Sequence, residues 1–375
     1  MSLASVLACI LSFLWPASQP DPPPYLPPPA TEEDLDYAEL AVVDLARAAT
    51  AEGRRALAAE VAGALRAQGF FYVVNHGYTP EQTNRIFSIA DVAFEEVSAR
   101  EKRAHSAPSR AVYEGYKPKQ TWNLASGIRD QIEHYNINHR VHRAAHPAAL
   151  RPYLAEIDGF ARHCHFNVLY PILRLLALGL DLPEDTLVDQ HRFEDAGESS
   201  VRFMKYHPRT DYEELKTKNV WLKGHTDIGS ITILWSQPVG GLQILSPDGQ
   251  WRWVRHIENA LVINAGDVME FLCGGYYPAT RHRVVLPPAD QRSIPRLGVF
   301  YFAMAADRTR LAPHAESAVL GAAGVRRLCP AGEEPTMEAW RTHRTRSYGT
   351  AELTKGQEKN VEEEVVHGVV VKHYN

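Results

Sequence analysis

Two histidines and one aspartate in the second half of the chain have the types and the spacing of metal ligands. His225 and Asp227 stand two positions apart, just before the apolar run 230–235. On an extended backbone, side chains at positions i and i+2 point to the same face, so this imidazole and this carboxylate can meet at one point. The candidate third ligand is His282, in the stretch 281–286. Two histidines and one carboxylate on one face of a metal leave coordination positions open, which is the ligand set of non-haem Fe(II) oxygenases.

The spacing alone is weak evidence for a metal site, because the chain contains 17 histidines. His256 and Glu258 repeat the pattern of an acid two residues after a histidine, as do His314 and Glu316. The prediction of a metal site therefore depends on the elements that surround His225 and on the motifs that accompany it.

The elements around these residues are predicted to be short strands. After about residue 200 the sequence changes to brief apolar runs separated by Gly, Pro, Asp and Asn, which is typical of a β-sandwich or barrel. The predicted strands are 201–207, 230–235, 241–246, 251–254, 260–264, 268–272, 281–286 and 296–303. Before residue 200 the pattern is mainly helical. It predicts helices over 55–68, 81–97 and much of 151–181, and strands over 38–43 and 70–74.

The composition is that of an ordinary globular protein. Apolar residues make up 45% of the 375 positions and charged residues 23%, which excludes a disordered chain and a polytopic membrane protein. The formal net charge of −5 argues against nucleic acid as a partner, because a protein led by phosphate contacts is normally basic. The four cysteines are scattered and include no C-x-x-C pair, so we expect no disulfide framework.

The amino terminus differs from the rest of the chain. Residues 3–15 form an apolar run that is too short to span a bilayer comfortably, and no Lys or Arg precedes Arg47, so the basic region of a secretory signal is missing. Eight prolines follow within 16–30, a composition that favours polyproline II. We expect residues 1–36 to be an unfolded extension and the fold to begin near Tyr37. We also expect a cytoplasmic protein without stable membrane association, with a cleaved signal or a weak anchor as the open alternatives.

Several motifs, standing in a fixed order, give the chain a family resemblance. Two lie in the first half: Val-Val-Asp-Leu at 42–45 and Gly-Phe-Phe-Tyr-Val-Val-Asn-His-Gly at 69–77. The others are Gly-His-Thr-Asp-Ile-Gly-Ser at 224–230, Val-Gly-Gly-Leu-Gln-Ile at 239–244, Val-Ile-Asn-Ala-Gly-Asp at 262–267 and Arg-His-Arg-Val-Val at 281–285. With these motifs the chain resembles the isopenicillin N synthase-like family of Fe(II)/2-oxoglutarate-dependent dioxygenases, over nearly everything from 40 to 305.

The resemblance implies an α+β fold with a mainly β core, which is a double-stranded β-helix (jelly-roll) with a helical amino-terminal portion. On this basis 37–200 are the mostly helical amino-terminal portion, 201–305 are the jelly-roll core, and 306–375 are a carboxy-terminal segment that could act as a lid. The resemblance also implies Fe(II) held by His225, Asp227 and His282, with 2-oxoglutarate as co-substrate and O2 as oxidant.

The far carboxylate of 2-oxoglutarate requires a fixed cation. Arginine is the physical choice, because its planar guanidinium matches a carboxylate with two parallel hydrogen bonds. The candidates are Arg292 and Arg296, and we prefer Arg296 because it opens the strand where the family has its Arg-x-Ser. Gly298 stands where that serine is expected. Tyr206 and His207 are predicted to contact the co-substrate, since either could supply the missing hydrogen bond.

The implied activity is the hydroxylation or desaturation of a C–H bond in a small or medium organic substrate, with release of succinate and CO2. The substrate is expected near Tyr113, Tyr116, Tyr135 and Phe302. One alternative is an iron-dependent enzyme of the same family that does not use 2-oxoglutarate, which the glycine at position 298 leaves open. The other is a non-catalytic jelly-roll that binds a ligand or a partner, although such a protein would not need the three metal-binding residues together. The sequence defines neither the substrate nor the oligomeric state.

Overall fold

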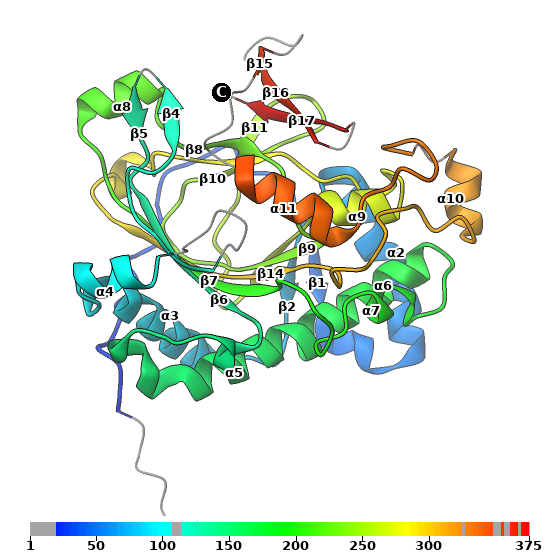
Figure 1. Cartoon of the computed structure of the whole chain (residues 1–375), viewed down its shortest axis with the longest axis horizontal. Helices are drawn as coiled ribbons and strands as arrows, with labels where there is room; N and C mark the ends of the chain where they lie inside the picture. Colours follow the sequence, from blue (N-terminus) through cyan, green and yellow to red (C-terminus); the bar gives the residue numbers. More distant parts are fainter. Residues whose placement is uncertain are drawn as a thin grey trace, which may run out of the picture.

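The computed structural model describes residues 20–106, 114–125, 127–324, 327–347, 354–355, 361–366 and 369–374. In this part of the chain two β-sheets face each other (Figure 1). The larger sheet has the strand order β1 (Val42–Asp44), β2 (Phe70–Val74), β12 (Leu261–Ala265), β9 (Ile231–Trp235), β14 (Arg296–Ala303), β7 (Ser200–Tyr206), β6 (Ile132–Asn138) and β3 (Gly115–Lys117). The second has the order β11 (Trp251–Trp253), β10 (Leu242–Leu245), β13 (His282–Val285), β8 (Val220–His225), β17 (Val369–Tyr374), β16 (Val361–Val366) and β15 (Thr354–Lys355). The predicted fold class, α+β with a jelly-roll core, is confirmed.

Helices cover the outer face of the larger sheet (Figure 1). They are α2 (Ala51–Gln68), α3 (Pro80–Glu95), α5 (Leu154–Arg162) and α6 (Tyr170–Gly179), with a π-helical segment over His163–Leu169 between the last two. α3 starts where its sequence favours a helix, because Thr79 and Gln82 form a capping box around Pro80. α2 ends at Gly69, whose φ of 69° is the left-handed conformation that glycine tolerates. A large cluster of buried apolar side chains joins these helices to the sheet.

The described part of the chain also contains shorter elements. They are the helices α4 (Ala99–Ala104), α7 (Thr186–Asp189), α8 (Asp211–Thr217), α9 (Asp267–Leu272), α10 (Ala318–Ala323) and α11 (Met337–Ser347), and the small sheet of β4 (Asn123–Ala125) and β5 (Ile128–Arg129). Short 3-10 helices cover Leu45–Ala49, Val141–Arg143, Ala148–Tyr153 and Ala289–Gln291. α11 lies across the open end of the barrel, on the side from which Figure 1 is viewed.

Three local predictions differ from the structure. The stretch 38–43, predicted as a strand, is a strand only from Val42, where β1 begins. The stretch 268–272, predicted as a strand, belongs to helix α9. Its apolar run is too short for periodicity to separate a strand from a helix, and the extended backbone of Gly266 starts a helical turn there. Strand β8, which carries His225, was absent from the predicted strands, because Lys223 and Gly224 interrupt its apolar pattern.

The three predicted portions of the chain share sheets with one another. Strand β2 of the amino-terminal portion pairs with β12 of the core, and β6 pairs with β7 along its whole length. The carboxy-terminal hairpin of β16 and β17 joins the second sheet where Tyr374 pairs with Gly224 of β8. The sequence divisions at 200 and 305 therefore do not coincide with a break in either sheet.

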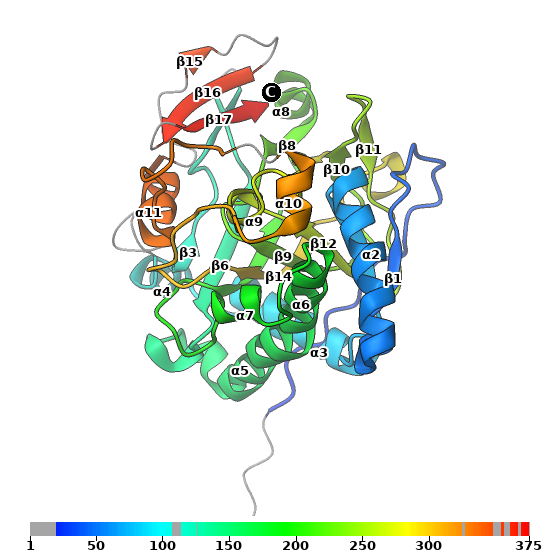
Figure 2. The same ribbon diagram turned by 90° about the vertical axis from the view of Figure 1, so that its right-hand side faces the viewer.

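The proline-rich segment also differs from its prediction. Residues 20–36 contain no helix or strand, as the prolines dictate, but they are packed on the body of the protein. The backbone N–H of Tyr25 donates to Ser88 Oγ of α3 at 3.0 Å, and Pro29 accepts a hydrogen bond from Gln291. Figure 2 shows this segment in dark blue. Hydrogen bonds to the body thus replace the hydrogen bonds that a regular element would provide. The apolar run 3–15 lies outside the described residues. Among the described residues, no helix is long and apolar enough to cross a membrane.

Candidate metal and co-substrate site

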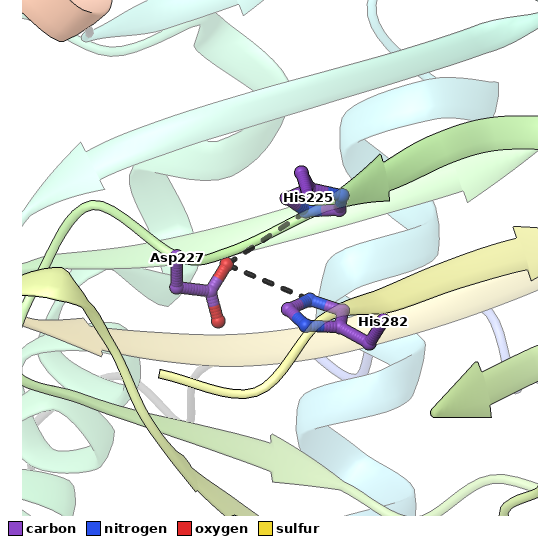
Figure 3. Close-up of side chains that lie close together, drawn as sticks. All are labelled: His225, Asp227 and His282. Carbon is purple, nitrogen blue, oxygen red and sulfur yellow. Dashed lines mark ion pairs between the residues drawn. The ribbon is translucent and has the colours of Figure 1, made fainter. Parts of the chain in front are cut away.

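The structure brings His225, Asp227 and His282 together. One ligand atom from each of them lies within 4.8 Å of the other two, and all three residues are buried. Asp227 Oδ1 is 3.9 Å from His225 Nε2 and 3.7 Å from His282 Nε2, and the side chains point toward one another (Figure 3). His225 ends β8 and His282 begins β13, and these two residues are partners in the antiparallel pairing of the strands. The sheet therefore sets the spacing of the two imidazoles, whereas Asp227 follows from the turn after β8.

Hydrogen bonds fix the orientation of both imidazole rings. His225 Nδ1 donates to the carbonyl of Lys223 at 2.8 Å, and His282 Nδ1 donates to the carbonyl of Thr280 at 3.1 Å. A carbonyl can only accept, so in each ring Nδ1 carries the proton and Nε2 carries the lone pair. This is the tautomer that a metal needs, and both Nε2 atoms face Asp227. The donor set therefore fits a divalent metal.

The carboxylate of Asp227 is held just as firmly. Its Oδ2 accepts hydrogen bonds from Thr232 Oγ1 at 2.6 Å and from Asn264 Nδ2 at 2.8 Å. Burial by itself would raise the pKa of Asp227, but the neighbouring His282 and His225 and these two hydrogen bonds outweigh it and lower the pKa. The side chain therefore stays an anion, with Oδ1 directed at the histidines.

Arg296 lies at the start of β14 and is 4% exposed. Its Nε has no hydrogen-bond partner among the described residues, and no carboxylate among them forms an ion pair with it. Burial lowers its pKa, but an arginine remains charged in proteins. A buried cation without a counter-ion is costly unless a ligand supplies one. Arg296 is thus suited to an anionic ligand.

One cavity connects Arg296 to the three clustered residues. It encloses about 1150 Å³ of empty space, a figure that includes the open mouth of the cavity. Alternate residues of β7 and β14 line one wall, because successive side chains of a strand point to opposite faces. These wall residues are Ser200, Arg202, Met204, Tyr206, Arg296, Phe300 and Phe302. Arg341 and Thr345, one helical turn apart on α11, line the outer end.

The ring of Phe300 occupies the place of the serine expected at Gly298. A Cβ atom built on Gly298 would lie 2.6 Å from the Phe300 ring, which is closer than real atoms approach. Phe300 in turn stacks on Phe302, with ring centroids 5.6 Å apart. A stacked aromatic surface therefore stands where the family pattern has a hydroxyl.

The structure does not bring every predicted residue to this cavity. His207 Nε2 contacts Glu133 Oε1 at 2.8 Å, and His207 is absent from the cavity lining. Tyr116 and Tyr135 are buried core residues that stack on each other with ring centroids 4.3 Å apart. They face the core because β3 and β6 turn them toward the helices, an orientation that the aromatic pattern alone does not show. Tyr113 lies outside the described residues. Tyr206 and Phe302 line the cavity, where they could meet a co-substrate or substrate.

Sequence reasoning overlooked the residues that position the ligands. Asn264 and Thr232 hold Asp227, and Arg202 and Arg341 line the outer cavity. Asn264 stands inside the motif at 262–267 that contributes to the family resemblance. Its place in that motif was a signal that could have identified it. Arg341 follows the predicted core by more than thirty residues, and no local pattern marks it.

Two family models match this chain. The model "2OG-Fe(II) oxygenase superfamily" matches residues 197–304, and "non-haem dioxygenase in morphine synthesis N-terminal" matches residues 40–154. Together with the jelly-roll and its His–Asp–His group, these matches show that the chain belongs to the 2-oxoglutarate- and Fe(II)-dependent dioxygenases of the isopenicillin N synthase-like superfamily. The chain is accordingly an oxidoreductase of a family that uses Fe(II), 2-oxoglutarate and O2.

Curated relatives include dioxygenases of plants and fungi. Leucoanthocyanidin dioxygenase 2 of Oryza sativa subsp. japonica is 28% identical over 267 residues, which are 68% of this chain and 69% of the relative. The 2-oxoglutarate-dependent dioxygenase FG08081 of Gibberella zeae is 35% identical over 169 residues, which are 44% of this chain and 49% of the relative. The chain thus spans about half to two thirds of the length of these relatives.

Solved structures share the fold. A full-length Neurospora crassa protein in complex with alpha-KG aligns with a TM-score of 0.72 and 20% identity, covering 84% of this chain and 100% of that chain. The dioxygenase for auxin oxidation of rice aligns with a TM-score of 0.64 and 20% identity, covering 82% and 96%. At these identities the similarity establishes the jelly-roll architecture.

Proposed function

We propose that this chain uses Fe(II) and 2-oxoglutarate to hydroxylate or desaturate a C–H bond of a small organic substrate, with release of succinate and CO2. One observation carries the proposal: a buried His–Asp–His group lines the same cavity as a buried arginine that has no counter-ion among the described residues. The first offers ligands to Fe(II) and the second offers a cation to the far carboxylate of 2-oxoglutarate. A non-catalytic binding protein would require neither arrangement.

His225, Asp227 and His282 would hold the iron on one face. Iron with 2-oxoglutarate supplies the oxidising chemistry by activating O2, and the protein supplies ligands, orientation and exclusion of water. The hydrogen bonds from Nδ1 of each histidine keep Nε2 ready to bind metal. Thr232 and Asn264 keep Oδ2 of Asp227 occupied, which leaves Oδ1 as the ligand atom.

Arg296 would bind the far carboxylate of 2-oxoglutarate, and Tyr206 flanks it. The guanidinium carbon lies 5.6 Å from the centroid of the Tyr206 ring, and the two residues are partners in the pairing of β14 with β7. Because Phe300 covers Gly298, the co-substrate would meet an aromatic surface there and would rely on Arg296 for its charge-assisted hydrogen bonds.

The substrate would occupy the outer part of the cavity. Apolar side chains such as Leu222, Phe302 and Met304 line it, together with the guanidinium groups of Arg202 and Arg341. Glu198 is the acid of this region, and Arg143 already holds it through two hydrogen bonds of 2.9 and 3.0 Å. Arg341 is likewise paired with Asp307 at 3.2 Å, and Arg202 Nε donates to Asn136 Oδ1 at 2.7 Å. The lining therefore favours a mostly apolar organic molecule that carries a hydrogen-bond-accepting group.

An anaerobic titration tests the assignment of metal and co-substrate. Purified protein, Fe(II) and 2-oxoglutarate should give the weak visible charge-transfer band of the chelate, and the His225→Ala variant should not. Tight Fe(II) binding without the band would favour a family member that does not use 2-oxoglutarate. Once the band is seen, screening candidate substrates by succinate release would test the C–H oxidation itself.

A further inference from the structure

The proline-rich arm, defined here as residues 20–37, is attached to the barrel at three places. Near its beginning Tyr25 stacks on Phe87 of α3, with ring centroids 6.0 Å apart. At its end the carbonyl of Asp36 accepts a hydrogen bond from the backbone of Trp253 in β11 at 2.9 Å. The third attachment lies between these two and concerns the loop that leads into β14.

This middle attachment consists of short polar contacts with residues 289–291. Asp290 accepts hydrogen bonds from Thr31 Oγ1 at 2.8 Å and from the backbone of Glu32 at 3.0 Å. The Glu33 carboxylate in turn accepts from the backbone N–H of Ala289 at 2.7 Å. The arm therefore holds the loop that stands five residues before Arg296.

Gln291 connects this loop to a second one. Its side chain is buried, and its Nε2 donates to the carbonyls of Pro29 in the arm at 2.9 Å and of Pro238 at 3.0 Å. Its Oε1 accepts from the backbone N–H of Gly240 at 2.8 Å. All three bonds are satisfied within the protein, so the arm and the 238–241 loop are fixed relative to each other.

The 238–241 loop lies next to Arg296, and both line the same cavity. Gly241 has a φ of 127°, and a Cβ atom at this position would lie 3.5 Å from Arg296 Cδ. Behind Arg296 lies a second cavity, whose lining includes Thr31 and Leu35 of the arm together with Arg296. Arg296 thus borders both the main cavity and a second cavity that the arm helps to line.

We infer that the arm and Gln291 position Arg296, so that they set the affinity for 2-oxoglutarate. A bidentate ion pair between a guanidinium and a carboxylate requires a fixed donor geometry. Gln291 acts as a positioning residue, since it reaches Arg296 through the 238–241 loop. The inference rests on the proposed function, in which Arg296 binds the co-substrate.

The test uses two variants of the full chain. Glu33→Ala combined with Asp290→Ala removes the exposed polar contacts between arm and loop, and Gln291→Met keeps the side-chain volume but removes its hydrogen bonds. The control combines Glu60→Ala with Asp189→Ala, which removes one Glu and one Asp from exposed ion pairs elsewhere. For each protein we would measure the Kd of 2-oxoglutarate from the anaerobic charge-transfer band, the Kd of Fe(II) by calorimetry, and hydrogen exchange over residues 20–37.

The Glu33→Ala/Asp290→Ala variant and the Gln291→Met variant should each weaken 2-oxoglutarate binding about tenfold, as expected for the loss of one or two hydrogen bonds. The affinity for Fe(II) should stay unchanged. In an Arg296→Ala background they should make no further difference. Faster exchange of the arm with unchanged 2-oxoglutarate affinity would overturn the inference, as would equal losses for iron and co-substrate. Additive losses in the Arg296→Ala background would do the same. A wild-type protein that forms no complex with 2-oxoglutarate would instead refute the proposed function and with it this inference.

Discussion

The two ends of the main cavity are built differently. At the inner end, His225 and His282 are oriented by the hydrogen bonds that they donate to backbone carbonyls, and Asp227 by hydrogen bonds that it accepts from neighbouring side chains. At the outer end, the wall is mostly apolar, and its polar groups come from two distant segments, β7 with Arg202 and α11 with Arg341. The inner end is built from paired strands, whereas the outer end depends on how a helix packs across the barrel.

This contrast separates two tasks. A metal tolerates little change in ligand position, so the ligands belong on strands whose pairing fixes their spacing, as between His225 and His282. Substrate choice depends on shape and on a few polar groups, which can change without disturbing the sheet. Substitutions at the inner end should therefore act on metal and co-substrate, and substitutions at the outer end on substrate alone.

The largest effect is expected at the metal ligands. His282→Ala should abolish measurable Fe(II) binding in anaerobic calorimetry, since it removes one of three protein ligands. His256→Ala is the matched control, because His256 also has an acid two positions later but pairs with the exposed Glu258. Undiminished Fe(II) binding by His282→Ala would refute the metal site.

The second largest effect is expected for Arg296→Ala. Losing the charge-assisted hydrogen bonds to a carboxylate should weaken 2-oxoglutarate binding about a hundredfold, or about 3 kcal/mol, while Fe(II) affinity stays unchanged. Arg296→Lys keeps the charge without the planar fork and should fall between the two. Titration of the charge-transfer band gives the Kd of 2-oxoglutarate for both variants. Equal affinities for the wild type and Arg296→Ala would move the assignment to another cation.

Asn264→Ala should have a smaller effect on the metal. It removes the hydrogen bond to Asp227 Oδ2 and leaves Thr232 in place, so Fe(II) affinity should fall about tenfold, as is usual when a ligand loses a supporting hydrogen bond. Calorimetry with Fe(II) would measure the change. A variant with unaltered affinity would show that Thr232 alone orients the carboxylate.

Gly298→Ser should show that the family hydroxyl cannot simply be restored. The new side chain would collide with the Phe300 ring, and overpacking of this kind costs about 1–3 kcal/mol, so Tm should fall by several degrees. The affinity for 2-oxoglutarate should not improve. Tighter binding with unchanged Tm would mean that Phe300 yields freely, and the aromatic surface would lose its assigned role.

The smallest effect on metal and co-substrate is expected at the outer end. Arg341→Ala should leave the Kd of Fe(II) and of 2-oxoglutarate within about twofold, because Arg341 lies on α11 at the outer end of the cavity. With any substrate found by succinate release, the same variant should raise KM. A large loss of iron or co-substrate affinity would remove the distinction between the two ends.

The residues at the inner end of the cavity could be predicted from the sequence far better than those at the outer end. His225, Asp227 and His282 stand in motifs whose spacing reflects strand geometry, and Arg296 opens a recognisable strand. Arg341 depends on the tertiary packing of α11, which no local pattern encodes. His207 was assigned to the co-substrate because of its neighbours in sequence, yet the alternation of β7 gives that place to Tyr206 and directs His207 to Glu133.

The proline-rich arm shows a second limit of sequence reasoning. Its prolines excluded helix and strand correctly, but composition says nothing of a docking surface that the rest of the fold creates. Tyr25 and Pro29 find their partners, Ser88 and Gln291, more than sixty and more than two hundred positions away. Contacts at such separations follow only from the assembled barrel.

The pairing of Tyr374 with Gly224 has a practical consequence for anyone who expresses this protein. Gly224 directly precedes His225, so Tyr374 lies beside the strand that presents a proposed metal ligand. A polyhistidine tag fused shortly after Tyr374 would place competing imidazoles near the candidate site, so Fe(II) titrations should follow its removal.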